Sequence, residues 1–428
     1  MIRICIVAVL GALAVTVARG QEPLGSQFVV NSEASFNPTA PRVAVSGDDG
    51  FFVVWTSAGS AGSDDDLWSV QGRRFAADQS PIGSQFQINN YTTSGQTHPD
   101  IARGADGRFF VVWESNGSFG ADNTLNSIQG RILESDGQFT GNEFQINTTP
   151  FGHQGSAAVA ASSTEHVVVW WDDGDVQGQR FDLNASPIDA EFQVNTEPYR
   201  NSVSGPDVDA APDGAFVVVW VSDSPGAVDD YWVRARQFDA MGDPLADEFS
   251  VSLDLDRIVQ FPRVLMEPDG DFSVFWLEDT NMLWRRFDAN GAPLSGEMLL
   301  SDTRPGVWDP NAVSLGPGGD VVALWRSDPG RGSQLFATLR GKGVVAPSSA
   351  LSPFELSSDE DVAERYPGVD HFDDGSFLVV WTRIPLDPQG AVGSLQAQTF
   401  AAPSPLFVDG FESGDSSAWS AAVPVPAP

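Results

Sequence analysis

The chain has 428 residues, of which 41% are hydrophobic, and this is enough apolar surface for a large core and excludes a largely disordered protein. Its formal net charge of −35 repels phosphate groups and anionic lipids, so nucleic acids and acidic membrane surfaces are discounted as partners. The 42 glycines, 29 prolines, 28 phenylalanines and 13 tryptophans are typical of an all-β protein with many turns.

Residues 1–20 have the features of a secretory signal peptide. Arg3 supplies a positive charge, residues 4–17 are an apolar run, and small residues stand before a predicted cleavage site at Gln21. The apolar run is too short for a good membrane span. The single cysteine, Cys5, falls within this peptide, so a mature chain without disulfides is expected. The sequence therefore predicts a secreted or cell-surface protein, of bacterial type, with no integral membrane segment after cleavage.

Four strand-like motifs then recur in a fixed order. A proline-led strand such as PRVAV (41–45) passes through a tight Asp-Gly turn into an apolar strand such as FFVVW (51–55). QGRRF (71–75) and QFQIN (85–89) follow, and the set is repeated along the chain. Four short antiparallel strands per unit are typical of a β-propeller blade, whose apolar strand is buried between neighbouring blades. The apolar strand occurs seven times, at residues 51–55, 109–113, 166–170, 216–220, 272–276, 321–325 and 377–381.

The two ends of the repeat region complement each other. The last repeat stops at QAQTF (396–400) without a final strand, whereas the mature chain opens with an unattached QFVVN (27–31). The sequence therefore predicts a seven-bladed β-propeller over residues 21–402, closed into a ring by its N-terminal strand, which removes the open sheet edges. We expect a monomer. Most length variation falls between the second and third strands of each repeat, so variable loops are expected to gather on one face and to bind ligands there.

The consensus G-x-FVVVW … GQRFD-x-x-G-x-P-x-G-x-EFQVN resembles a repeat of large secreted bacterial proteins, over about residues 22–400. The segment LFVDGFESGDSSAWS (406–420) resembles a C-terminal motif, DGFESGD-x-SAW, of exported proteobacterial proteins. The second resemblance implies a targeting or processing role, and the alternative is a mobile acidic tail. Residues 403–428 are therefore assigned to this motif and a Pro/Ala-rich tail.

Acidic runs in the Gly/Ser-rich variable loops are candidate ligands for Ca²⁺, the one cofactor that the sequence suggests. Carboxylate oxygens are the ligands that this cation prefers. No run matches a twelve-residue EF-hand loop, and the alternative interpretation is that these acids simply face water. The candidates are Asp64, Asp65, Asp66, Asp172, Asp173, Asp175, Asp229 and Asp230.

Five tryptophans near the same loops are candidate ligand-face residues, because aromatic rings offer broad apolar faces to a carbohydrate. The alternative interpretation is that they cap the core between blades. The tryptophans that end the seven apolar strands are interpreted as structural, because one functional site does not need seven copies. The arginines of the third strands are interpreted as partners of acids across blades. The ligand-face candidates are Trp68, Trp171, Trp232, Trp284 and Trp308.

No catalytic residue is assigned. The four histidines lack the spacing of zinc ligands, and the sequence contains no H-E-x-x-H, G-x-S-x-G or P-loop motif. The leading hypothesis is a secreted, non-enzymatic binding or adhesion scaffold that recognises a protein or a glycan through its variable loops, with calcium as a candidate aid. The rival hypothesis is an extracellular polysaccharide hydrolase or lyase with carboxylates at the channel mouth. A third is a purely structural envelope component.

Overall fold

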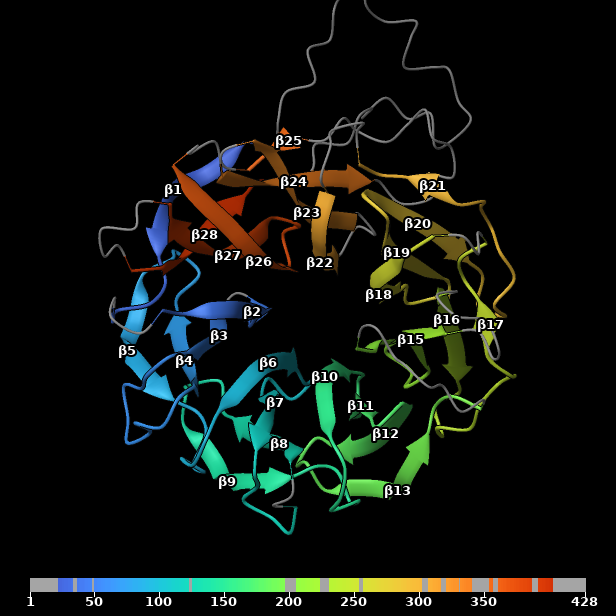
Figure 1. The fold of residues 1–428 in the computed structure, drawn as a ribbon, viewed down its shortest axis with the longest axis horizontal. Helices are drawn as coiled ribbons and strands as arrows, with labels where there is room; N and C mark the ends of the chain where they lie inside the picture. Colours follow the sequence, from blue (N-terminus) through green and yellow to red (C-terminus); the bar gives the residue numbers. More distant parts are fainter. Residues whose placement is uncertain are drawn as a thin grey trace, which may run out of the picture.

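The computed structural model describes residues 22–33, 37–47, 50–122, 125–196, 205–223, 231–253, 257–301, 307–316, 321–330, 332–340, 354–356, 361–386 and 392–402. The predicted signal peptide and the C-terminal motif lie outside these ranges. The elements within them are 28 β-strands, arranged as a ring of sheets around a central channel (Figure 1). Among the described residues, none form a helix with the length and apolar character needed to cross a membrane.

Five of the sheets have four antiparallel strands each, in chain order from the centre of the ring outward. Tight turns join the first strand to the apolar second strand where the Asp-Gly signals predict them, for example at Asp106-Gly107 and Asp213-Gly214. The first two sheets comprise β2 (Thr39–Val45), β3 (Phe51–Ser57), β4 (Ser69–Phe75) and β5 (Pro81–Gln87), then β6 (Gln96–Arg103), β7 (Phe109–Asn116), β8 (Asn126–Leu133) and β9 (Phe139–Gln145). The third sheet comprises β10 (Gln154–Ala161), β11 (Glu165–Asp172), β12 (Asp175–Asp182) and β13 (Pro187–Gln193). The fourth comprises β14 (Asp207–Ala210), β15 (Phe216–Asp223), β16 (Tyr231–Phe238) and β17 (Phe249–Ser250). The fifth comprises β18 (Val259–Met266), β19 (Phe272–Glu278), β20 (Asn281–Phe287) and β21 (Met298–Leu299).

The sixth sheet has eight strands, so the predicted count of seven separate blades is wrong: the described strands form six hydrogen-bonded sheets. A single parallel pairing, between Ser333 and Ala363, joins β24 to β26 and merges the last two strand sets. A sequence period counts copies of a motif, and it does not show whether neighbouring copies share a hydrogen bond. This sheet comprises β1 (Pro23–Val29), β22 (Val307–Leu315), β23 (Val321–Gly330), β24 (Gly332–Arg340), β25 (Phe354–Glu355), β26 (Val362–His371), β27 (Phe377–Pro385) and β28 (Ser394–Phe400).

The N-terminal strand closes the ring, as the complementary chain ends predict. β1 pairs antiparallel with β28, with Phe28 opposite Ala397 and Val29 opposite Gln396. The Val30 N–H continues the ladder to the Leu395 carbonyl (2.9 Å). The first described strand therefore covers the edge that the last strand would otherwise leave open.

The apolar second strands form the core, and both of their faces are buried. Val54 of β3 lies in one cluster with Val111 of β7, while the adjacent Val53 lies in another cluster with Val380 of β27. Alternate residues of a single strand therefore pack against the two neighbouring sheets. The seven tryptophans that end these strands are at most 1% exposed, which confirms their structural interpretation.

A polar residue at the end of six fourth-strand motifs fastens that strand to the third strand. The Asn147 Oδ1 accepts a hydrogen bond from the Ile128 N–H (2.9 Å), and its Nδ2 donates to the Asp122 carboxylate (3.0 Å) and to the Thr149 carbonyl (2.8 Å). Residues that accept a third-strand N–H in this way are called latch residues. They are Asn31, Asn89, Asn147, Asn195, Ser252 and Ser301.

Third-strand arginines reach across to the neighbouring sheet. The Arg131 Nη1 donates to the Ile88 carbonyl (2.7 Å), and the Arg285 Nη1 donates to the Val251 carbonyl (2.8 Å). Both carbonyls belong to the residue before a latch residue, and two further arginines repeat the contact. The inter-sheet role predicted for these arginines is confirmed, but the partner in these four bonds is a backbone carbonyl and not an acid. The other pairs are Arg73 with Val30 and Arg236 with Val194.

Candidate ligand site at the channel mouth

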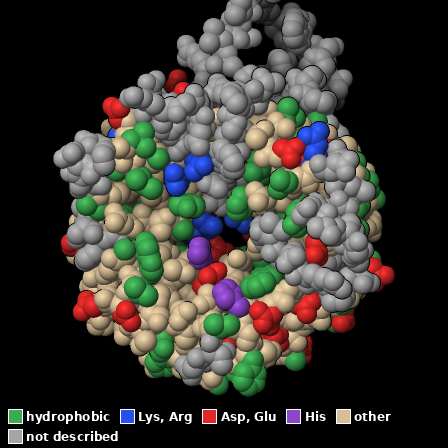
Figure 2. Space-filling view, viewed as in Figure 1, with side chains coloured by type: hydrophobic (Ala, Val, Ile, Leu, Met, Phe, Trp, Pro, Cys, Tyr) green, Lys and Arg blue, Asp and Glu red, His purple; other side chains and the backbone are tan. Residues whose placement is uncertain are grey.

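The first strands of the sheets surround a central cavity of about 1010 Å³. Figure 2 shows a hollow at the centre of the ring, with histidine, acidic and basic side chains at its edge. Thr39, at the start of β2, pairs with Thr56 near the end of β3, so the β3–β4 loop lies at the end of the channel where β2 starts. Trp68, from that loop, lines the cavity. We call this end, on the side of the predicted variable loops, the channel mouth.

Five of the inner strands carry the same irregularity at the channel mouth. Their register shifts by a β-bulge, and one non-glycine residue in each bulge has a positive φ between 50° and 53°. This conformation costs an L-residue roughly 1–2 kcal/mol, and residues with bulky side chains adopt it least often. The five residues, which we call the bulge ring, all line the cavity. They are Ala40, His98, Ser156, Phe261 and Tyr366.

Gly205 stands at the corresponding place before β14, and it also lines the cavity. A Cβ built on Gly205 would lie only 2.1 Å from the Ser156 Cβ and 2.8 Å from its hydroxyl oxygen. A side chain at this position is therefore excluded, because Ser156 already occupies the space. The bulge ring presents different chemistry at each point: a methyl group, an imidazole, a hydroxyl, a phenyl ring and a phenol.

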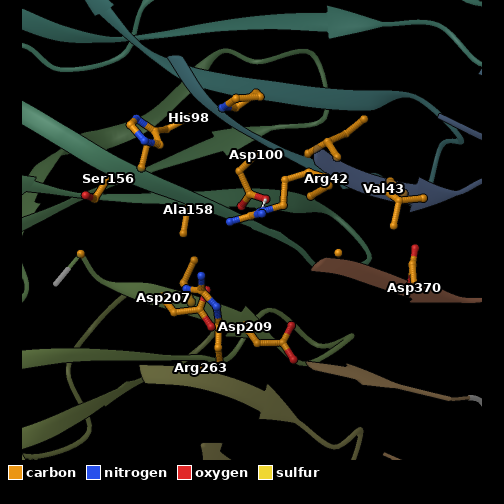
Figure 3. A pocket seen from close by; sticks show the side chains of 18 of the residues that line it. Arg42, Val43, His98, Asp100, Ser156, Ala158, Asp207, Asp209, Arg263 and Asp370 are labelled. Atoms are coloured by element: carbon orange, nitrogen blue, oxygen red, sulfur yellow. Dashed lines mark ion pairs between the residues drawn. The ribbon is translucent and has the colours of Figure 1, made fainter. Parts of the chain in front are cut away.

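Below the bulge ring, aspartates tie three pairs of neighbouring inner strands together, and Figure 3 shows where these aspartates lie. The Asp100 carboxylate accepts a hydrogen bond from the Val159 N–H (2.9 Å), and Asp207 accepts one from the Val264 N–H (2.9 Å). Asp209 accepts from Met266 (2.7 Å) and Asp370 from Val45 (2.8 Å) in the same way. These bonds join β6 to β10, β14 to β18 and β26 to β2, so the aspartates of the first-strand motif hold the channel wall together.

Arginines offset part of this negative charge. Arg42 lies 3.7 Å from Asp100, and Arg263 lies 3.6 Å from Asp207. Burial raises the pKa of Asp207, although the charge of Arg263 opposes the shift. Burial also lowers the pKa of Arg42, with a further contribution from the nearby charge of Arg263. For Asp209, which has no arginine this close among the ion pairs of the described residues, burial raises the pKa to about 7.

His98 of the bulge ring forms a pair with the buried Glu114 of β7. The His98 Nδ1 lies 3.3 Å from a Glu114 carboxylate oxygen, and the His98 side chain is 66% exposed while that of Glu114 is 12% exposed. The hydrogen bond to Glu114 raises the pKa of His98. Burial raises the pKa of Glu114, but the hydrogen bond and charge of His98 outweigh it, and the pKa of Glu114 lies below its ordinary value. The other Glu114 oxygen accepts a hydrogen bond from the Ser156 N–H.

The structure brings only one of the five candidate tryptophans to the described lining of the cavity. Trp68 lines the mouth and is 37% exposed. Trp171 is half-buried against His153 (ring centroids 5.5 Å apart), and Trp232 is half-buried beneath the Arg234 guanidinium (5.2 Å). Trp284 is buried in the core cluster that contains Phe275. Trp308 belongs to β22, where it pairs with Arg326, and its side chain is outside the described set.

The predicted calcium ligands are engaged within the protein rather than gathered around one point. Asp64 is buried and accepts a hydrogen bond from Asn89 (2.7 Å), and Asp175 accepts one from Asn195 (2.9 Å), so both support latch residues. In the described part of the chain, no three acidic, histidine or cysteine residues are grouped as metal ligands would be. Three of the remaining candidates accept hydrogen bonds: Asp66 from the Ser94 N–H (2.9 Å), Asp172 from Gln154 (2.8 Å) and Asp173 from the His153 N–H (3.2 Å). Asp65 is exposed, and Asp229 and Asp230 lie outside the described residues.

The sequence reasoning missed the bulge ring, although a signal was present. Four of its five residues precede a proline, and that proline stands a fixed distance before the strand-end tryptophan: Pro41 before Trp55 and Pro99 before Trp113, for example. A proline cannot donate to the sheet ladder and within strands is confined to edges, first residues and bulges, so a proline at a constant place in the first strands marks a bulge there. Ser156, which precedes an alanine, carries no such mark.

Comparison with known proteins supports the fold and no more. No protein-family model and no curated protein sequence matches this chain. Among solved structures, a Dyadobacter fermentans protein of unknown function is similar with a TM-score of 0.56 at 10% identity, covering 90% of this chain and 99% of its own. The polysaccharide lyase Uly1 is similar with a TM-score of 0.54 at 10% identity, covering 91% and 95%. The β-propeller domain of the Trilobed protease from Pyrococcus furiosus, described as having an open velcro topology, gives a TM-score of 0.50 at 10% identity, covering 85% and 95%.

Proposed function

We propose that the protein is a secreted or cell-surface, non-enzymatic binding or adhesion scaffold that recognises a glycan or a protein at the channel mouth. The observation that carries this proposal is the cavity of about 1010 Å³, because pockets of this size enclose small ligands or the end of a longer one. Around it, one backbone irregularity recurs with a different side chain at each point. A repeated scaffold that presents variable groups is suited to recognition.

The loops beside the mouth add contact area. The β3–β4 loop exposes Leu67 and Trp68, and the β7–β8 loop exposes Phe119 and Leu125. Both loops are long, and each is held by a latch residue through an acid, Asp64 or Asp122. The predicted repeat resemblance and the C-terminal motif support export, and a role of that motif in targeting or processing is part of the same proposal.

The test is binding without turnover. The purified protein is applied to a glycan array and, separately, to immobilised extracellular proteins, and bound oligosaccharides are recovered and checked for cleavage. We expect retention of an intact ligand that weakens in a Trp68→Ala variant. Met241→Ala is the matched control, because Met241 is exposed in the turn between β16 and β17, away from the cavity lining. Retention that is unchanged by Trp68→Ala and by mouth-loop variants would place binding elsewhere.

A second candidate function is extracellular polysaccharide hydrolysis or elimination, and the His98–Glu114 pair is the observation that favours it. An imidazole whose pKa is raised by a carboxylate partner can take up and release a proton near neutral pH. The test is product release from polysaccharide substrates by the wild-type chain and by His98→Gln and Glu114→Gln variants. Turnover that both variants abolish would replace the binding proposal with this one.

Calcium assistance is a further part of the proposal, supported by carboxylates in the loops beside the mouth. Asp65 and Asp66 are exposed next to the buried Asp64, and carboxylate oxygens are what this cation requires. The test compares the melting temperature in about 1 mM Ca²⁺ with that in excess chelator, because extracellular calcium sites are filled at about this concentration of Ca²⁺. An unchanged melting temperature removes calcium from the account and leaves the channel-mouth proposal standing.

A further inference from the structure

We propose that the bulge ring determines ligand specificity and that its ligand is a neutral glycan, with one sugar ring held between the aromatic and polar sides of the mouth. This inference rests on the proposed binding function and deepens it, because it assigns both the selecting residues and the chemical class of the ligand. The aromatic side is formed by Phe261 and Tyr366, and the polar side by His98 and Ser156.

The backbone supplies the first argument. Each bulge ring residue holds a positive φ that a glycine would adopt with far less strain. A bulge needed only to bend the strand is therefore best served by glycine. The chain keeps a non-glycine residue at five of the six corresponding positions described above, Gly205 being the exception. These five include a phenylalanine and a tyrosine, which are among the side chains least suited to this conformation. Backbone strain that is retained at the edge of a cavity indicates that the side chains it orients have a function there.

The aromatic side supplies the second argument. Phe261 lies on β18 and Tyr366 on β26, the inner strands on either side of β22, and both are half-buried in the cavity wall. Phe261 packs against the core cluster around Leu265, which holds its ring in place. Trp68 adds a third ring at the mouth from the β3–β4 loop. Fixed aromatic faces suit the apolar C–H face of a sugar and lose little conformational entropy when they bind it.

The polar side supplies the third argument. His98 and Ser156 lie on β6 and β10, whereas Phe261 and Tyr366 lie on β18 and β26. Figure 1 shows where these four strands stand around the ring. Glu114 fixes both polar residues at once, because one oxygen contacts the His98 ring and the other accepts the Ser156 N–H. The imidazole edge is then an oriented hydrogen-bonding group, and the exposed Ser156 hydroxyl lines the same cavity. Both can donate and accept hydrogen bonds, as the hydroxyl groups of a sugar require.

The charge of the cavity decides between neutral and acidic glycans. Its described lining contains Arg42, Arg103 and Arg263 against four aspartates, of which Asp209 is only partly ionised near neutral pH. The charge of His98 is countered by its partner Glu114, so the lining is close to neutral and no strong positive field favours a uronic acid. Arg42 and Arg263 are also already paired with Asp100 and Asp207. An acidic chain with a formal charge of −35 further repels an anionic polymer. A neutral hexose or hexosamine oligomer meets no such barrier.

The experiment uses the full mature chain and an array of neutral hexose and hexosamine oligosaccharides together with uronic-acid oligosaccharides. Phe261→Gly and Tyr366→Gly each remove an aromatic ring, and glycine also relieves the backbone strain at that position. The relief of strain offsets part of the stability lost with the ring. Ala185→Gly is the matched control, because Ala185 holds a positive φ of 59° in the turn between β12 and β13, outside the cavity lining, and the change removes only a methyl group. Tyr366→Ser is a second removal of the phenol, and each variant is checked by its melting temperature.

We expect the wild-type chain to retain a neutral oligosaccharide, with affinity falling about tenfold or more in Phe261→Gly and Tyr366→Gly and unchanged in Ala185→Gly. Neutral-glycan binding that survives all ring removals overturns the role of the bulge ring and leaves the proposed function intact. Retention of uronic-acid oligosaccharides alone, or of a protein ligand alone, overturns the ligand class. Absence of any ligand in both screens overturns the proposed function itself, and this inference with it.

Discussion

The latch residues give the sharpest prediction about stability. In Asn147→Ala, the buried Ile128 N–H loses its acceptor, and the buried Asp122 carboxylate loses a donor that lies 3.0 Å away. A buried N–H left without its acceptor costs about 1–3 kcal/mol, and one hydrogen bond lost by Asp122, which keeps other contacts, adds about 1 kcal/mol. We therefore expect a loss of about 2–4 kcal/mol in the free energy of unfolding. That is a large share of the 5–15 kcal/mol typical of a folded domain.

The chain itself provides the matched control. Ser252 and Ser301 occupy the latch position in two other sheets, where their hydroxyl oxygens accept the N–H groups of Val233 (3.0 Å) and Met282 (3.1 Å). Asn147→Ser therefore restores the acceptor for the Ile128 N–H but not the donor to Asp122. It should recover about 1–3 kcal/mol of the loss in the alanine variant.

The assay is equilibrium urea unfolding followed by tryptophan fluorescence, with the midpoint and slope measured for wild type and both variants. The expected order of stability is wild type, then serine, then alanine. An alanine variant within about 0.5 kcal/mol of wild type, or a serine variant no better than alanine, would show that the latch is not what holds the fourth strand.

Three further predictions concern the ring and the channel. Deleting residues 22–30 exposes the edge of β28, so it should lower the melting temperature and promote aggregation. A synthetic peptide of residues 22–33 added in trans should restore the melting temperature. An unchanged melting temperature after the deletion would contradict ring closure. Asp209 has a folded-state pKa of about 7, above its unfolded value, so its contribution to stability is present below about pH 4 and is lost as the pH rises through 7. Wild type should lose stability relative to Asp209→Asn between pH 5 and pH 8 in urea titrations, and parallel curves would contradict the raised pKa. Ala40→Gly should raise the free energy of unfolding by about 1 kcal/mol by relieving the positive φ, and a loss of stability would show that the bulge is not strained.

The core of the fold could be predicted from the sequence because it depends on local pattern. A run such as FVVVW (216–220) has no polar side, so it must be buried on both faces, and all five of its residues are. The unmatched strand at each end of the repeat region likewise predicted the pairing of β1 with β28. The sheet count failed because one backbone pairing, between Ser333 and Ala363, depends on how two neighbouring copies sit in space.

The candidate site was harder to predict because it is assembled from distant residues. Asp100 and the Val159 N–H are far apart in the chain, and the packing of two neighbouring sheets brings them within 2.9 Å. The acidic run at Asp64 looked like a cation site because sequence shows charge and not partners, and its partner Asn89 lies at the end of another strand. The loop around Trp68 indicated correctly that this residue is on the surface. The position of Trp284 in the core follows from packing between sheets, which the sequence does not show.

The most direct test of the account is a crystal structure of the mature chain with the oligosaccharide that the array selects. The account predicts a sugar ring in the central cavity, stacked on Tyr366 or Phe261 and hydrogen-bonded to His98 or Ser156. A sugar bound on the outer strands, with the cavity and the bulge ring untouched, would contradict it.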